Sequence, residues 1–175
     1  MTRDRSTDRS VRPLTEARLR RIAAYHLERW ESSREGLRRV LLRRVDRAVR
    51  AGVGDREALA EIVARIVEDH VGLGTVDDRR YAEAAVRRAR ARGGSARKVA
   101  TVLAAKGIDR ETSAEALRTD ETSELDAARA YARRRGLGAW RSGPTDPERA
   151  RKDLAAMGRA GFGYDVARRA LADAD

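Results

Sequence analysis

The 175-residue sequence contains no cysteine, which excludes disulfide bonds and thiolate metal sites. Aromatic residues make up only 4% of the chain, so helices packed through small side chains are expected rather than a thick core of rings. No apolar run approaches the roughly 20 residues that a membrane-spanning helix needs. The first residues also lack the apolar stretch of a secretory signal peptide. These absences predict a cytoplasmic protein that has no contact with a membrane.

The usual sequence signatures of enzymes are missing as well. The chain has no GxxxxGK[ST] phosphate-binding loop, no GxSxG nucleophile motif and no HExxH zinc motif. Its two histidines, His26 and His70, lie in helical patterns without further metal-ligand spacing. We therefore expect a protein that is not an enzyme, with no catalytic residues, no cofactor and no metal.

Charge is what the sequence has in abundance. Charged residues reach 38%, and the formal net charge is +11 because 39 lysines and arginines stand against 28 acidic residues. A protein this basic usually has a polyanionic partner, and nucleic acid is the leading candidate.

The apolar residues recur at helical spacing, and no stretch alternates with the period of a strand. Residues that cap helices stand at several predicted helix starts. They are Thr15, a capping box from Ser32 to Glu35, Ser95, Asp109, and Asp146 followed by Pro147. The sequence therefore predicts an all-α fold.

An internal repeat accompanies this helical pattern. A shift of 54 residues aligns Gly107 with Gly161 and Ile108 with Phe162. The pattern predicts a disordered tail at 1–14, a first helical repeat with a leading helix at 15–74, a second repeat at 75–122 and a third at 123–175, with a flexible connection at 136–147. Short units of this kind bury more core when they stack on their neighbours.

Charge follows the same rhythm along the chain. Residues 34–50, 79–98 and 129–152 carry net charges of +5, +7 and +6, and residues 55–78 and 109–126 carry −5 each. Three basic blocks suggest repeated contacts along an anionic ligand, and the alternative is that they are solvated helix faces. The candidate contact residues are Arg38, Arg39, Arg43, Arg87, Arg88, Arg90, Arg92, Arg97, Lys98, Lys106, Arg151 and Lys152.

The stretch "TVDDRRYAEAAVRRARARGG", residues 75–94, combines two aspartates with the most basic block. Asp77 and Asp78 could be a metal-binding pair, but a helix start fits better because further ligands are missing. On the helix that follows, Tyr81 is expected to point inward. Arg87 and Arg90 are expected on the exposed face, where guanidinium groups can bind phosphates or carboxylates.

The stretches "DDRRYAEA", "KGI" and "KDLAAMGRAGFGYDVARRAL" resemble the RecX family of recombination regulators, and the resemblance extends from about residue 15 to residue 172. It implies an elongated, curved, all-helical body of three tandem three-helix repeats. It also implies a partner, the RecA recombinase filament on single-stranded DNA, whose ATPase, strand-exchange and co-protease activities members typically inhibit. DNA repair, homologous recombination and the SOS response would be affected. The positions that match the family signature are Asp77, Asp78, Arg80, Tyr81 and Gly107.

Two other functions are compatible with these residues. A stand-alone helix-turn-helix protein would prefer one duplex sequence, whereas a RecX-like protein would bind free DNA weakly and without sequence preference. A metal-dependent nuclease built around Asp77 and Asp78 would cleave DNA only with Mg²⁺. A monomer is the simplest oligomeric state.

Overall fold

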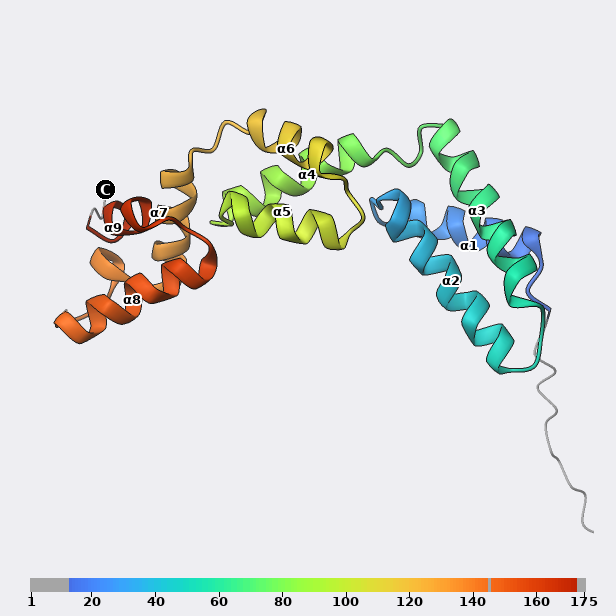
Figure 1. Ribbon diagram of the computed structural model, residues 1–175, viewed down its shortest axis with the longest axis horizontal. Coiled ribbons are helices and arrows are strands. Elements are labelled where there is room, and N and C mark those ends of the chain that lie inside the picture. Colours follow the sequence, from blue (N-terminus) through green and yellow to red (C-terminus); the bar gives the residue numbers. More distant parts are fainter. Residues whose placement is uncertain (1–12, 145, 173–175) are drawn as a thin grey trace, which may run out of the picture. The chain divides into compact units, whose positions relative to one another are not determined.

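Figure 1 shows the computed structural model of the chain, which describes residues 13–144 and 146–172. These residues form nine α-helices and one 3₁₀ turn and contain no strand, which confirms the predicted all-α class. The elements are α1 (Glu16–Leu27), α2 (Arg34–Arg50), α3 (Arg56–Gly72), α4 (Asp78–Ala91), α5 (Ala96–Ala105), α6 (Arg110–Arg118), α7 (Glu124–Arg135), η1 (Gly138–Trp140), α8 (Pro147–Ala160) and α9 (Tyr164–Ala172). Residues 1–12 of the predicted N-terminal tail lie outside the described residues. No described helix is long and apolar enough to cross a membrane.

The chain divides into two compact units, Met1–Asp77 and Asp78–Asp175. In the first unit, α1, α2 and α3 all contact one another. The second unit contains α4 to α6, which pack together, followed by α7, η1, α8 and α9. The three repeat boundaries read from the sequence stay a prediction.

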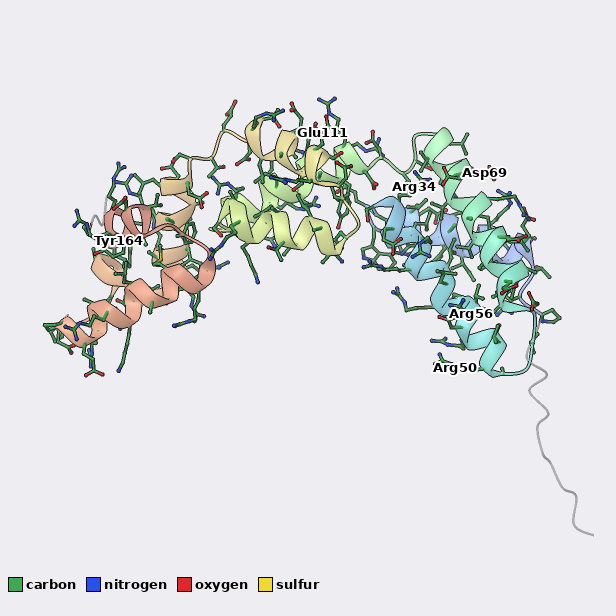
Figure 2. The ribbon with its side chains drawn as sticks, in the orientation of Figure 1. Arg34, Arg50, Arg56, Asp69, Glu111 and Tyr164 are labelled. Atoms are coloured by element: carbon green, nitrogen blue, oxygen red, sulfur yellow. The ribbon has the colours of Figure 1, made fainter. Side chains whose placement is uncertain are left out.

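The first unit is held together by an aliphatic core. Each helix supplies apolar side chains at three- and four-residue spacing, so that they share one face. The fully buried members are Leu19, Ala23, Leu37, Leu41, Val45 and Ile66. On the surface, Arg20 of α1 pairs with Asp69 of α3 at 2.7 Å, and Arg56 of α3 pairs with Asp46 at 3.2 Å. Asp69 and Arg56 are labelled in Figure 2. Exposed pairs of this kind contribute little because solvent screens them, so the core dominates stability.

Most of the predicted helix starts are confirmed. The side chains of Thr15, Ser95, Asp109 and Asp146 each accept a hydrogen bond from a backbone N–H three residues later. The capping box predicted from Ser32 to Glu35 is wrong by one residue. Ser33 is the N-cap and accepts from the Gly36 N–H at 3.0 Å. The Glu35 side chain therefore does not close a box and turns to two arginines of its own helix.

The second unit has two apolar clusters built largely from small residues. Ala82, Val86, Val99, Leu103, Ile108 and Ala116 form the cluster between α4, α5 and α6. The cluster of α7, α8 and α9 contains Met157 and Phe162 together with five buried alanines. The low aromatic content predicted such packing, because small side chains let helices approach closely.

The internal repeat is visible in two helix ends of the second unit. Gly107 follows α5 with a φ of 81°, and the N–H of Ile108 donates to the Leu103 carbonyl at 3.1 Å. Gly161 follows α8 in the same way, and the Phe162 N–H donates to Met157 at 3.1 Å. Both turns use the hydrogen bond of a Schellman motif and bury the apolar residue after the glycine.

The connection between α7 and α8, predicted to be flexible at 136–147, is anchored through its first half. The N–H of Gly138 donates to the carboxylate of Asp153 on α8 at 2.8 Å, and Arg141 pairs with the same carboxylate. Asp153 is buried, and Leu137 and Trp140 pack against the apolar cluster beneath them. A single buried carboxylate thus fixes the 3₁₀ turn, which the composition of the segment did not indicate.

Candidate nucleic-acid interface

The most basic block of the sequence lies on α4, whose first residue is Asp78. Asp77 precedes the helix and Asp78 lies in its first turn, where the helix dipole favours a carboxylate. The predicted helix start is therefore confirmed. Tyr81 is half-buried against the α4–α6 cluster as expected, and Arg80 is exposed. In the part of the chain that the structure describes, no group of three or more His, Cys, Asp or Glu side chains could hold a metal ion.

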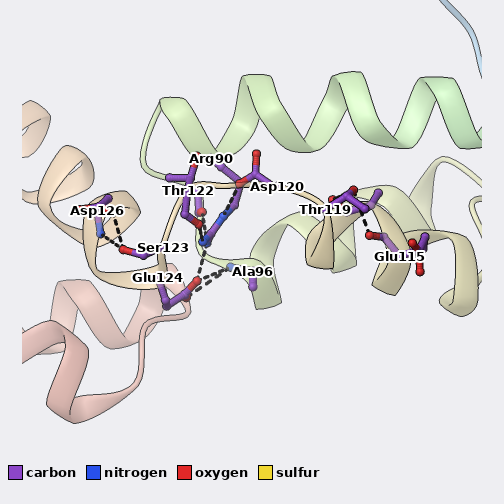
Figure 3. A network of polar contacts seen from close by, with 11 residues as sticks. Arg90, Ala96, Glu115, Thr119, Asp120, Thr122, Ser123, Glu124 and Asp126 are labelled. Atoms are coloured by element: carbon purple, nitrogen blue, oxygen red, sulfur yellow. Dashed lines mark hydrogen bonds and ion pairs between the residues drawn. The ribbon is translucent and has the colours of Figure 1, made fainter.

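Arg90 corrects the expectation that the arginines of α4 point outward. Its side chain is 5% exposed and pairs with Asp120, also 5% exposed, at 3.4 Å, and with Glu124 of α7 (Figure 3). It also donates to the carbonyls of Thr122 at 2.6 Å and Gly94 at 3.2 Å. A guanidinium with these partners is structural, because it has no face left for a phosphate. Arg90 is therefore not a phosphate contact.

The other candidate contact residues are all exposed. In the first unit they are Arg38, Arg39 and Arg43, and in the second they are Arg87, Arg88, Arg92, Arg97, Lys98, Lys106, Arg151 and Lys152. Their exposure is necessary for the predicted role, which stays a prediction.

Several of these cations already have an acidic partner. Arg38 and Arg39 pair with Glu35 at 2.6 and 2.7 Å, and Lys152 pairs with Glu148 at 2.6 Å. A phosphate that bound these side chains would compete with a carboxylate one turn away. They are therefore weaker candidates than cations without such a partner.

Arg87 has an acidic environment of another kind. It lines a hollow together with Glu83, Asp120 and Glu121, whose carboxylates oppose the approach of a polyanion. Arg151 lies in a mostly apolar hollow beside Leu154. Neither the environment of Arg87 nor that of Arg151 favours contact with a phosphate group.

The cations without a carboxylate partner among the described residues include Arg43, Arg92 and Lys98. Arg97 donates to the Gly158 carbonyl at 3.3 Å and so also links α5 to the end of α8. Arg92 and Lys98 lie on the two sides of the α4–α5 turn and line one hollow. The structure thus brings two predicted residues of the central block together.

Sequence reasoning missed three further cations of this hollow. Arg134 and Arg135 at the end of α7 and Arg159 near the end of α8 line it with Arg92 and Lys98. Arg134 and Arg135 belong to the basic block at 129–152, but Arg159 lies outside all three basic blocks. The run of three arginines before Gly136 was the sequence signal available for two of these cations. The tertiary fold shows that Arg134 and Arg135 of this run line the hollow.

Glu35 provides a test of the pairing in the first unit. The hydrogen bond from Arg38, opposed by burial and assisted by Arg39, lowers the pKa of the Glu35 carboxyl from 4.5 to about 2. A carboxyl whose pKa is lowered by folding contributes stability above pH 4.5 and loses that contribution as the pH falls toward 2.

Replacement of Glu35 by Gln should remove this pH-dependent contribution. We expect the wild type to be more stable than Glu35→Gln above pH 4.5, and the difference to shrink as the pH approaches 2. Urea unfolding of both proteins across this range measures it. A difference that does not change with pH would show that the carboxylate makes no such contribution.

Comparisons with known proteins agree with the all-helical architecture. Residues 77–117, which contain α4, α5 and all but the last residue of α6, match the family model described as RecX, second three-helix domain. The crystal structure of RecX from Lactobacillus salivarius superposes with a TM-score of 0.65 and covers 89% of this chain and 94% of that chain. At 19% sequence identity, that likeness supports the fold alone.

Two relatives are more similar to this chain in sequence. The Regulatory protein RecX of Myxococcus xanthus (strain DK1622) is 40% identical over 157 residues, which are 87% of this chain and 83% of the relative. The Regulatory protein RecX of Agrobacterium fabrum (strain C58 / ATCC 33970) is 32% identical over 154 residues, 87% of this chain and 81% of the relative. Identity at this level over most of both proteins shows common membership. The chain belongs to the RecX family of regulatory proteins.

Proposed function

We propose that this protein regulates the RecA recombinase by binding its filament on single-stranded DNA and inhibiting ATP hydrolysis, strand exchange and co-protease activity. Regulation of this kind would affect DNA repair, homologous recombination and the SOS response. The observation that carries the proposal is the 40% identity to a Regulatory protein RecX over 87% of the chain. The protein would act in the cytoplasm as a monomer, without a cofactor and without catalysis of its own.

The distribution of cations supports a filament over a compact ligand. Both units carry exposed arginines that pair with no carboxylate of the described residues, such as Arg43 in the first and Arg92 in the second. Modest contacts that are joined through one chain add up on a repetitive partner because the second contact is intramolecular. Phosphate neutralisation would make the binding fall with salt, by about 0.7 log units per log unit of salt for each single-strand phosphate contacted.

A binding experiment tests the proposal against a stand-alone helix-turn-helix protein. The affinity of the full chain is measured for RecA filaments on single-stranded DNA, for the free single strand and for a pool of duplexes. We expect much tighter binding to the filament than to either free DNA, and no preferred duplex sequence. Reproducible selection of one duplex at physiological salt would favour the helix-turn-helix protein instead.

The central cations should contribute to filament inhibition. We expect the double variant Arg92→Ala/Lys98→Ala to need several-fold more protein for half-inhibition of the recombinase ATPase, because two phosphate contacts are lost. The control is Arg168→Ala/Arg169→Ala, which removes the same charge from exposed positions of α9. Equal inhibition by the two variants would show that only net charge matters.

A further inference from the structure

The hollow at the α4–α5 turn is a cationic site whose walls come from three parts of the second unit. The turn contributes Gly93 and Gly94, α7 contributes Tyr131, and the end of α8 contributes Ala156 and Ala160. Its volume is about 390 Å³, within the roughly 300–1,000 Å³ typical of small-ligand sites. The glycines and alanines among these residues have side chains too small to fill this space.

Five cations surround the hollow, and no acidic side chain lines it. They are Arg92, Lys98, Arg134, Arg135 and Arg159. Within residues 13–144 and 146–172, none of the five pairs with a carboxylate. Gathering like charges without a counterion is unfavourable in the free protein, and an anion in the hollow would relieve that repulsion.

The walls are held in place before any ligand arrives. The hydroxyl of Ser95 donates to the Ala160 carbonyl at 2.7 Å, which joins the start of α5 to the end of α8. Arg97 donates to the neighbouring Gly158 carbonyl at 3.3 Å. Because these bonds span the hollow's two sides, binding an anion there needs little ordering of the backbone.

An aromatic ring lies in the same wall. Tyr131 is half-buried, and its ring is 5.8 Å from that of Phe162, which supports it from the core. The Arg134 guanidinium lies 5.8 Å from the centre of the Tyr131 ring. Cations beside an aromatic face are the combination that single-stranded nucleic acids use, since the backbone needs charge and the bases need a stacking surface.

The cationic surface continues beyond the hollow. Arg92 and Arg134 also line a second hollow of about 610 Å³, where Arg129, Arg133 and one carboxylate, that of Asp126, join them. Two adjacent hollows that share two arginines suit a chain of regularly spaced anions better than one isolated carboxylate group.

We propose that the cations of the hollow bind successive phosphodiester groups of single-stranded nucleic acid, about one for each cation, and that a neighbouring base stacks on Tyr131. This deepens the proposed function by assigning DNA contact to a specific site of the second unit. Binding of free single strands needs no recombinase, so this assignment can fail while regulation of the filament stands, and the reverse is also possible.

The test compares the full chain with Arg134→Ala/Arg135→Ala by fluorescence anisotropy of a labelled oligothymidylate at several salt concentrations. We expect the log–log salt slope to decrease in magnitude by about 1.4, the value for two lost single-strand contacts. Arg168→Ala/Arg169→Ala is again the matched control for net charge and should keep most of the wild-type slope. A second variant on other elements, Arg92→Ala/Arg159→Ala, should show the same decrease. Circular dichroism confirms that each variant is folded.

Other outcomes would overturn the assignment. The hollow is not the site if the Arg134→Ala/Arg135→Ala variant has the same affinity and the same salt slope as the control. Displacement of the oligothymidylate by polyglutamate as readily as by unlabelled oligothymidylate would identify a carboxylate site on an acidic protein instead. If a base stacks on Tyr131, the Tyr131→Leu variant should bind oligothymidylate about 5-fold more weakly or worse. Unchanged affinity of that folded variant would exclude the base contact.

Discussion

Replacement of Arg90 by Ala is expected to lower the free energy of unfolding of the second unit by about 3–5 kcal/mol, the usual effect of removing one partner from a buried ion pair. The substitution leaves the buried carboxylate of Asp120 and the Thr122 carbonyl without their donor. Glu124, which also accepts from the Ala96 N–H, would lose the cation that positions it (Figure 3). The network joins α4 to the starts of α5 and α7, so the loss should affect all three.

Urea unfolding followed by circular dichroism measures this effect. The matched control is Arg87→Ala, which removes an exposed arginine one turn earlier and should change stability by no more than about 0.5 kcal/mol. Arg90→Lys should be intermediate, because an ammonium keeps the charge but cannot reproduce the fork of donors. Equal stability of the Arg90→Ala and Arg87→Ala variants would contradict the structural role of Arg90.

Replacement of Gly93 by Ala should lower the free energy of unfolding by a comparable amount, because it changes the backbone at the α4–α5 turn. Gly93 has a φ of 81°, and an added Cβ would lie 2.7 Å from the Tyr131 Cα and 2.9 Å from the Ala127 carbonyl oxygen. Left-handed backbone costs a non-glycine residue about 1–2 kcal/mol, and overpacking typically adds about 1–3 kcal/mol. We therefore expect a destabilisation of about 2–5 kcal/mol as the turn is pushed away from α7.

Gly52 offers the matched control, since its φ is 74° and nothing lies within 4 Å of an added Cβ. Gly52→Ala should cost only the backbone term of about 1–2 kcal/mol. The Gly93→Ala variant should also bind oligothymidylate more weakly, because the turn forms one wall of the cationic hollow. Identical unfolding free energies for the two variants would show that the turn does not pack against α7 as described.

Helix starts and ends could be read from the sequence because they depend on neighbouring residues. Thr15, Ser95 and Asp109 cap the helices that follow them, and Gly107 ends α5 where its backbone freedom is needed. Two adjacent serines precede α2, and the choice of Ser32 over Ser33 illustrates the limit of local signals. Either hydroxyl can cap a helix, and only the observed start of the helix decides between them.

The site was harder to predict because it depends on which helices meet. Arg90 was expected on the exposed face of α4, but it follows the buried residues Ala82 and Val86 at four-residue spacing. The acidic segment around Asp120 and Glu124 covers that position, a contact across 30 residues that no local pattern shows. For the same reason, no local pattern shows that Arg135 and Arg159 lie together. They are 24 positions apart in the sequence and line one hollow.

The most direct test of the proposed regulation is the ATPase rate of RecA filaments on single-stranded DNA, titrated with this protein at a low and a high salt concentration. We expect inhibition at low salt and a higher half-inhibitory concentration at high salt, with a smaller shift for Arg92→Ala/Lys98→Ala. An ATPase rate that stays unchanged at both salt concentrations, with the protein folded and in excess over the filament, would contradict the proposed function.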